Sequence, residues 1–322
     1  MTLSTIVCTF NRAASLQRTL QSLAEATAPP DCPWELIVVD NNSTDETRTV
    51  IDSFIADGRL PLRRVMEESP GLSHARNRGV AVAAGEIVSF TDDDVVVDPD
   101  WLTRIAEAFA GFDATAVGGR ILPLWETPPP DWLDAGLHAY LALADYGDRP
   151  VYLETPKVWG ANLSFRAEVF RRFGRFDTAL GRAPGKLYAG EEVDYLRKLL
   201  RAGEKILYYP PAVVFHCIGG RRVTKEYFRR WKYDQGELEA MGAGPGSGGD
   251  VARHLFRLIS REIPRYAAHT ILRSRKSFAA ELRVFHTLGC LSGMKNARGA
   301  PAGRPVGLSQ AGTRAGRTGE SP

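Results

Sequence analysis

Short apolar runs alternate with amphipathic stretches along the front part of the chain. Four largely apolar runs are predicted to be strands, and they cover residues 3–10, 35–39, 62–66 and 86–90. Between these runs apolar residues recur at helical spacing, as in Leu16, Leu20 and Leu23 and in the segment 73–84. Strands that alternate with helices of this length favour a mostly parallel sheet with helices on both faces, so the expected fold class is α/β and Rossmann-like.

The pattern changes after residue 113. The segment 123–150 is rich in proline, tryptophan and aspartate and is expected to pass over the site as a long excursion. Strands are predicted at 163–165, 205–209 and 212–215, the last two divided by a Pro-Pro pair, and a helix at 191–202. A first domain should therefore cover 1–220. A basic amphipathic helical segment is expected over 221–296, and a disordered tail over 297–322, where large apolar side chains are nearly absent.

Charge is divided unevenly between the two ends of the chain. Residues 1–220 carry 22 Lys and Arg against 30 Asp and Glu, a net charge of −8, whereas residues 221–322 carry 19 against 8, a net charge of +11. The acidic part suits a metal-dependent site. The basic part has an arginine at every fourth position, namely Arg253, Arg257, Arg261 and Arg265. This pattern suits an anionic membrane surface, and the alternative is a basic helix that is solvated or packed on its own domain.

Several kinds of site and partner are disfavoured by what the sequence lacks. No two of the four cysteines have C-x-x-C spacing, so neither a zinc site nor a redox pair is indicated, and reduced cysteines suit a reducing compartment. No signal peptide is visible, and no apolar stretch reaches the ~20 residues that span a bilayer. No interleaved aromatic and basic motif points to nucleic acid. The expected location is the cytoplasm, either in solution or peripheral on the inner face of the cell membrane.

Polar residues follow three of the predicted strands directly. They are Thr9-Phe10-Asn11-Arg12, Asp40-Asn41-Asn42 and Thr91-Asp92-Asp93-Asp94. Ligands of open α/β sheets bind beyond the carboxyl ends of the strands, so these three groups should meet in one crevice.

The triple aspartate is the strongest chemical signal in the sequence. Adjacent carboxylates repel one another unless a cation or water is near, and in an extended backbone Asp92 and Asp94 would face the same side. Hard oxygen ligands suit Mg²⁺ or Mn²⁺, which could also bridge a diphosphate. The alternative is a solvated acidic turn. Near it, Asp40 could accept a hydrogen bond from a base or merely cap a helix, Phe10 could stack on a base or belong to the core, and Arg12 could contact a phosphate.

The strings VCTFNR, VVDNNSTDET and GLSHARNRGVAVAAGEIVSFTDDD occur in this order and spacing, and together they resemble the inverting family 2 glycosyltransferases, which have the GT-A fold. The resemblance covers about residues 3–217. It implies a nucleotide-sugar donor, usually a UDP-, GDP- or dTDP-sugar, and Mg²⁺ or Mn²⁺. It also divides the first domain into a nucleotide-sugar half, about 1–118, and an acceptor half, about 119–220.

Site residues follow from the resemblance motif by motif. Those implied to contact the nucleotide sugar are Thr9, Phe10, Arg12, Asp40, Arg76, Asp92 and Asp93. Those implied to hold the metal are Asp94, Asp92 and His216, although a lone histidine after an apolar run is commonly a packed polar residue. The segment 160–166 resembles the family segment beside the donor sugar and the acceptor, which points to Gly160 and Asn162.

A base is required because an inverting transferase must remove a proton from the acceptor hydroxyl. In the family the base is the second residue of an acidic pair that opens a helix, which here is Glu192. Many relatives have aspartate at that position, so Glu191 and Asp194 stay as alternatives. The other interpretation is that these carboxylates merely favour the helix N-terminus, by roughly 0.3–1 kcal/mol.

The sequence therefore predicts an inverting glycosyltransferase that moves a sugar, most simply from a UDP-sugar, to a saccharide or polyprenyl-linked acceptor by metal-assisted single displacement. A sugar nucleotidyltransferase is one alternative, but such enzymes usually have a glycine-rich loop after the first strand, and residues 9–12 contain no glycine. An inactive nucleotide-sugar-binding protein is the other alternative.

Overall fold

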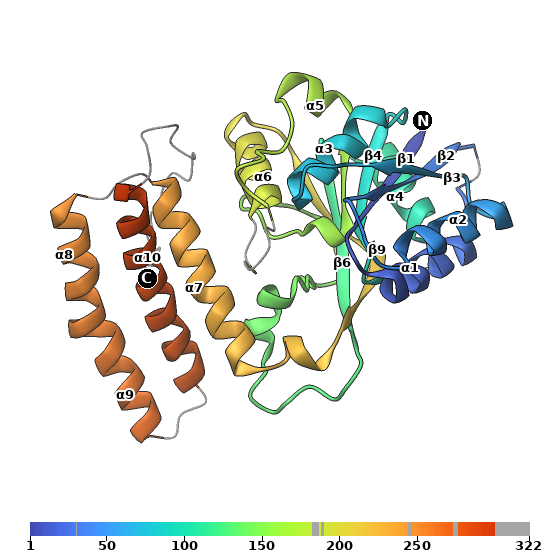
Figure 1. Cartoon of the computed structure of the whole chain (residues 1–322). Helices are drawn as coiled ribbons and strands as arrows, with labels where there is room; N and C mark the ends of the chain where they lie inside the picture. Colours follow the sequence, from blue (N-terminus) through green and yellow to red (C-terminus); the bar gives the residue numbers. More distant parts are fainter. Residues whose placement is uncertain (30, 182–186, 188–189, 244–246, 273–275, 300–322) are drawn as a thin grey trace, which may run out of the picture. The chain divides into compact units, whose positions relative to one another are not determined.

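The structure, a computed structural model, describes residues 1–29, 31–181, 187, 190–243, 247–272 and 276–299. The chain divides into two units, Met1–Trp231 and Lys232–Pro322. Figure 1 shows the sheet of the first unit and the helices of the second. Phe228 and Trp231, at the end of the first unit, pack on Tyr140 with ring centroids 5.5 and 4.8 Å from that of Tyr140.

The first unit is built on one sheet. Its order in the described residues is β3-β2-β1-β4-β8-β6-β9-β5, with β7 paired to β9. The parallel half consists of β1 (Leu3–Thr9), β2 (Trp34–Asp40), β3 (Leu62–Met66) and β4 (Ile87–Asp92). The other half consists of β5 (Val95–Val97), β6 (Ala116–Trp125), β7 (Val151–Tyr152), β8 (Leu163–Arg166) and β9 (Ile206–Ile218). The predicted strands are therefore present, with bounds that differ by a few residues.

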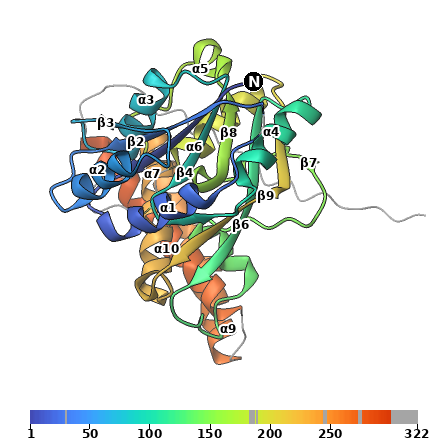
Figure 2. The same cartoon turned by 90° about the vertical axis from the view of Figure 1, so that its right-hand side faces the viewer.

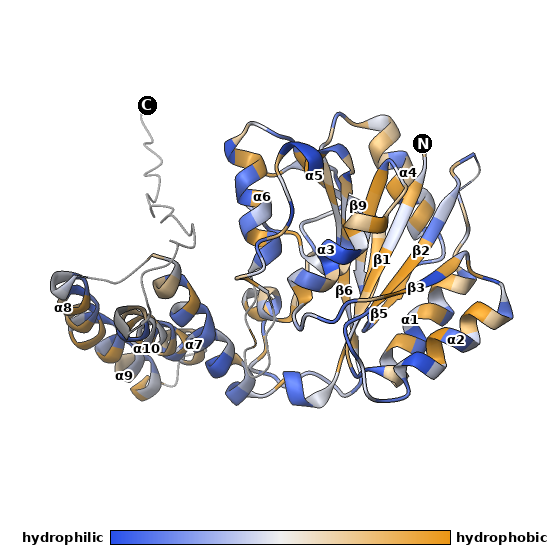
Figure 3. Ribbon diagram, turned by 45° about the horizontal axis from the view of Figure 1, so that its top comes forward, coloured by the Kyte–Doolittle hydropathy of each residue, from blue (hydrophilic) through white to orange (hydrophobic). Residues whose placement is uncertain are grey.

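Helices cover both faces of this sheet, as Figure 3 shows. They are α1 (Ala13–Glu25), α2 (Thr47–Asp57), α3 (Leu72–Val82), α4 (Trp101–Gly111), α5 (Glu168–Arg172) and α6 (Glu191–Arg201). One core contains β-sheet residues such as Ile6 and Phe90 together with Tyr195 and Leu196 of α6. The fold class is thus the expected α/β arrangement.

Strand β9 differs from the prediction of two strands separated by Pro210-Pro211, because it runs through both prolines beside β6 (Figure 2). The register between β6 and β9 shifts after Gly119, which leaves carbonyl groups without ladder partners. The amide of Asn162 compensates, donating to the carbonyl oxygens of Arg120 at 3.0 Å and Ala212 at 2.9 Å. A side chain from a neighbouring segment therefore lets the strand continue.

The described part of the second unit is helical. Its elements are the end of α7 (Lys225–Gly242), α8 (Gly248–Arg257), the π-helix η4 (Leu258–Glu262), α9 (Ile263–Ile271) and α10 (Ser277–Gly299). Helix α10 packs against α8, η4 and α9. It includes residues 297–299, and the rest of the predicted tail lies outside the described residues. None of the described helices combines the length and apolar character that crossing a bilayer requires.

Candidate active site

The carboxyl ends of three strands meet at one edge of the sheet. Strand β1 lies between β2 and β4, and the register pairs Thr9 with Asp40 and Cys8 with Asp92. The expected convergence of the three polar groups is confirmed by this register.

A cavity of about 380 Å³ opens at this edge. Its lining includes the end of β1, the turn after β4, the first turns of α3 and α6, and the connection after β9. The excursion over 123–150 contributes Ala139, Tyr140 and Ala142, as expected for a segment that passes over the site. Of the predicted site residues, the cavity is lined by Thr9, Phe10, Arg12, Arg76, Asp92, Asp93, Asp94, Gly160, Glu191, Glu192 and His216.

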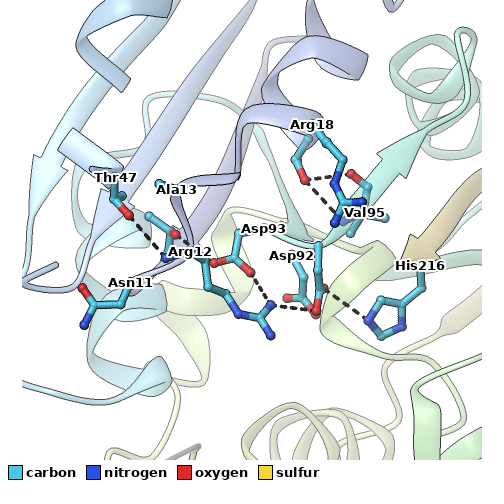
Figure 4. Close-up of polar contacts among 12 residues, drawn as sticks. Asn11, Arg12, Ala13, Arg18, Thr47, Asp92, Asp93, Val95 and His216 are labelled. Carbon is cyan, nitrogen blue, oxygen red and sulfur yellow. Dashed lines mark hydrogen bonds and ion pairs between the residues drawn. The ribbon is translucent and has the colours of Figure 1, made fainter. Parts of the chain in front are cut away.

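Arg12 neutralises the aspartate turn (Figure 4). Its Nη1 donates to Asp93 Oδ1 at 2.9 Å and to Asp94 Oδ2 at 2.7 Å. Thr9 Oγ1 donates to the second oxygen of Asp93 at 2.8 Å. Burial raises the pKa of Asp93 to about 6 in spite of these contacts. Asp93 therefore has a structural role in holding Thr9 and Arg12, beside whatever contact it makes with a ligand.

Asp94 is held in its ionised form by three neighbouring groups. Burial acts to raise its pKa, but His216, Arg222 and Arg12 together hold it well below its usual range. The Nε2 of His216 lies 3.2 Å from Asp94 Oδ1, and Arg222 Nη1 lies 3.3 Å from Asp94 Oδ2 and 2.9 Å from His216 Nε2. A carboxylate and an imidazole thus converge on a point that a cationic group occupies.

Asp92 differs from the expectation that it shares a face and a metal with Asp94. Strand β4 ends at Asp92 and the chain turns at the next two residues, so the extended geometry behind that expectation is absent. Asp92 Oδ1 instead lies 3.6 Å from Arg76 Nη2. Among the residues that the structure describes, no three carboxylate, imidazole or thiol side chains gather as metal ligands.

The donor set at Asp94 nevertheless fits a hard divalent cation. Such ions bind through one or two protein ligands and complete their shell with water and substrate phosphates. Asp94 supplies an oxygen donor and His216 supplies a nitrogen donor. The positively charged guanidinium of Arg222 lies beside both of them. A site made of Asp94 and His216 is thus compatible with the geometry, whereas Asp92 contacts Arg76.

Arg76 connects the aspartates to the acidic pair of α6. Its guanidinium, 4% exposed, has Nη1 at 2.5 Å from Glu191 Oε1 and 3.4 Å from Glu192 Oε2. Together with the contact to Asp92, three carboxylates surround one buried cation. The predicted nucleotide-binding residue Arg76 is therefore engaged mainly by the protein's own carboxylates.

The two glutamates have different environments although they are adjacent. The side chain of Glu191 is fully buried and its Oε2 has no hydrogen-bond partner among the described residues, whereas that of Glu192 is 16% exposed and lines the cavity. Burial, and then the charge of Glu192, raise the pKa of Glu191 to about 8, against the opposing effect of Arg76. Burial therefore disfavours negative charge on Glu191, and Glu192 is the member of the pair that a ligand can reach.

Gly160 leaves the space that the Arg76 guanidinium fills. A Cβ at this position would overlap the Nη2 and Cζ atoms of Arg76. We expect Gly160→Ala to displace Arg76 and to lower kcat/KM by roughly 10- to 100-fold, because small shifts of positioned groups are costly to catalysis. Steady-state kinetics would measure this. The control is Gly111→Ala, whose added methyl group meets no atom within 4 Å; equal kinetics for the two variants would contradict the expectation.

Three predicted residues do not line the cavity. Asp40 is buried, and its Oδ1 accepts a hydrogen bond from the Ser43 amide at 2.9 Å. The amide of Asn162 is hydrogen-bonded on both sides. Its Nδ2 donates to the two carbonyl groups at the β6–β9 shift, and its Oδ1 accepts from Trp101 Nε1 at 2.9 Å. Asp194, half-buried on α6, lies away from the cavity, and burial raises its pKa. These geometries favour structural roles for all three side chains.

The cavity also includes residues that the sequence did not single out. Arg222 follows the last strand in a short 3-10 helix, η3 (Gly220–Arg222). From the predicted polar group after β2, Asn41 is the residue that lines the cavity. Three aromatic residues, Tyr140, Trp159 and Trp231, form part of the wall. The aromatic content of the 123–150 excursion was the available signal for Tyr140, but nothing in the Arg221-Arg222 pair distinguishes the residue that reaches Asp94.

Comparison with solved structures identifies the fold. The mannosyltransferase PcManGT from Pyrobaculum calidifontis superposes with a TM-score of 0.54 at 20% identity, over 94% of this chain and 76% of that one. The central sheet with its flanking helices is the GT-A fold.

Comparison of sequences identifies relatives. A glucosyl-dolichyl phosphate glucuronosyltransferase from Haloferax volcanii is 29% identical over 220 residues, which are 67% of this chain and 69% of the relative. The succinoglycan biosynthesis protein ExoM from Rhizobium meliloti is 27% identical over 233 residues, 72% of each chain. The family model described as glycosyl transferase family 2 matches residues 4–174, more than half of the chain. This match agrees with the cavity at the strand ends and with the acidic start of α6. The chain is therefore a glycosyltransferase and belongs to family 2.

Proposed function

We propose that the enzyme transfers a sugar from a nucleoside diphosphate sugar, most simply a UDP-sugar, to a hydroxyl of a saccharide or lipid-linked acceptor with inversion at the anomeric carbon. The relatives support the acceptor class, since one is named for a dolichyl phosphate sugar and another for succinoglycan synthesis. The complex of PcManGT with GDP-Man and Mn²⁺ supports the donor class and the metal. The free cysteines of the chain are consistent with action in the cytoplasm.

One observation carries the proposal. Glu192, a reachable carboxylate, lines the same cavity as the guanidinium groups of Arg12 and Arg222, which contact Asp94 beside His216. A single displacement needs a base on the acceptor side and positive charge on the leaving-group side of one reacting carbon. Both elements are provided by a single cavity of about 380 Å³.

On the donor side, Arg12 and Arg222 are placed to contact the diphosphate. Phe10, which is 53% exposed at the cavity rim, offers an apolar surface to the base. Asp94 and His216 would hold Mg²⁺ or Mn²⁺. When bound, the cation would neutralise negative charge that develops on the leaving diphosphate.

On the acceptor side, Glu192 takes the proton from the attacking hydroxyl. Arg76 contacts both glutamates and so fixes the orientation of Glu192 beside the buried Glu191. Tyr140, Trp159 and Trp231 give the wall flat aromatic surfaces, which suit the apolar face of a pyranose ring.

Product analysis tests the proposed function. The full chain is incubated with Mn²⁺, a panel of nucleotide sugars and candidate acceptors. We expect release of a nucleoside diphosphate and a product whose anomeric configuration, measured by NMR, is opposite to that of the donor. Release of pyrophosphate would instead identify a nucleotidyltransferase. A donor that raises Tm by mass action without turnover of any acceptor would favour the inactive binding protein.

A further inference from the structure

Helices α8 and α9, joined by η4, present an apolar face to solvent. Phe256, Ile259 and Ile263 follow one another at three- and four-residue steps, Ile271 comes eight residues after Ile263, and Leu272 follows it at the end of α9; we call these five residues the outer face. Their exposed fractions are 73%, 66%, 46%, 80% and 75%. Every large hydrophobic side chain of the described residues that is more than 60% exposed belongs to this face.

The opposite side of the same helices is fixed by packing. Leu258 and Glu262 are buried, and Glu262 forms ion pairs with Arg257 at 3.2 Å and with Arg283 of α10 at 3.3 Å. Because the ion pair between Glu262 and Arg283 joins this helical stretch to α10, the outer face cannot turn inward without breaking that contact and exposing Leu258. Its exposure is therefore a property of the packed unit.

Two hydroxyl groups of these helices are already hydrogen-bonded to the backbone. Ser260 donates its hydroxyl to the Phe256 carbonyl at 2.6 Å, and Thr270 donates to the Tyr266 carbonyl at 2.8 Å. Both hydroxyls are thereby satisfied within their own helix. The face can then enter an apolar medium without leaving these donors unpaired.

Arginines lie along one flank of the outer face. Arg253 pairs with Asp250 at 3.2 Å, whereas Arg261 and Arg265 are exposed and pair with no carboxylate among the described residues. Residues 232–322 carry 14 Lys and Arg against 7 Asp and Glu, a net charge of +7. The charges of Arg261 and Arg265 therefore lie beside the outer face, unpaired within the described residues, in a part of the chain with a positive net charge.

We propose that the outer face docks into the surface of an anionic phospholipid bilayer. The apolar side chains enter the boundary between headgroups and acyl chains, and Arg261 and Arg265 contact the lipid phosphates. This chemistry favours a lipid surface over a second copy of the chain, because a copy would bring another positive flank instead of negative charge. Docking is independent of the proposed transfer reaction, which uses residues of the first unit.

Sedimentation with vesicles tests the proposal on the full chain. We expect binding to vesicles of phosphatidylcholine with phosphatidylglycerol and much weaker binding to phosphatidylcholine alone. The double variant Phe256→Ser with Ile259→Ser should lose at least roughly tenfold in affinity, because the apolar area that would leave water is removed. Arg261→Gln with Arg265→Gln should lose roughly fivefold per arginine at low salt, and little at high salt.

Matched controls lie in the first unit. Ile55 and Val151 are 42% and 47% exposed, and Arg48 is an exposed arginine of α2. Ile55→Ser with Val151→Ser, and Arg48→Gln, should leave vesicle binding unchanged. Failure of the wild-type chain to bind anionic vesicles would overturn the proposal, as would equal losses in the controls. A dimer in ultracentrifugation that Phe256→Ser with Ile259→Ser dissociates, without vesicle binding, would assign the face to a second copy instead.

Discussion

Glu192→Gln is expected to lower kcat by roughly 10²- to 10⁴-fold with little change in the KM for the donor, because general base catalysis contributes about that factor. Glutamine keeps the shape of the side chain and a hydrogen-bonding oxygen but cannot accept the acceptor's proton. The donor contacts predicted for Arg12 and Arg222 do not involve this position. Steady-state kinetics with a fixed acceptor would measure the effect, and nucleotide-induced shifts in Tm would show that donor binding persists.

Glu191→Gln is the matched control for that variant. Because burial raises the pKa of Glu191 to about 8, removing its charge is a smaller change than at the accessible Glu192. We expect a loss in kcat of less than roughly tenfold, with the Arg76 contact retained as a hydrogen bond. The reverse pattern, a large loss in Glu191→Gln and near-normal turnover in Glu192→Gln, would transfer the role of base to Glu191.

The parallel half of the fold was predictable because each of its strands has a signal within its own few residues. Each strand from β1 to β4 is a short apolar run, and the residues that end the runs must meet once the strands are parallel. The convergence of Thr9, Arg12 and the aspartates at one edge followed from that rule alone. The acidic pair at the start of α6 was also visible, since carboxylates at a helix N-terminus form a recognisable pattern.

The remaining features depend on contacts between distant segments. Sequence spacing placed Asp92 and Asp94 on one side, but the chain turns at Asp93, where Arg12 stabilises the turn. Asn162 was predicted beside the sugar, yet the Pro-Pro segment of β9 leaves carbonyl groups that its amide must satisfy. A short stretch of sequence does not determine either outcome. Each depends on a hydrogen-bond partner that lies far away in the sequence.

Replacing Asp94 with asparagine should lower kcat/KM by roughly 10²- to 10³-fold, as expected when charge stabilisation of a leaving group is lost. Asp94 is the carboxylate around which His216, Arg12 and Arg222 gather, and asparagine would remove the charge without changing the shape. The expected signature is a rise in the Mn²⁺ concentration needed for half-maximal rate, measured at saturating donor. Circular dichroism would check the fold, because three cationic or polar groups lose a buried partner.

Two further variants make the expectation specific. Asp93→Asn alters the adjacent residue of the same turn, whose side chain contacts Thr9 and Arg12 instead of His216 and Arg222, and should change the Mn²⁺ dependence little. His216→Gln leaves the Asp94 carboxylate in place and removes the imidazole, so it should reproduce the weakened Mn²⁺ dependence even if Asp94→Asn proves unstable. Wild-type Mn²⁺ dependence in both Asp94→Asn and His216→Gln would show that the cation is held elsewhere, and that Arg12 and Arg222 alone face the diphosphate at this edge of the sheet.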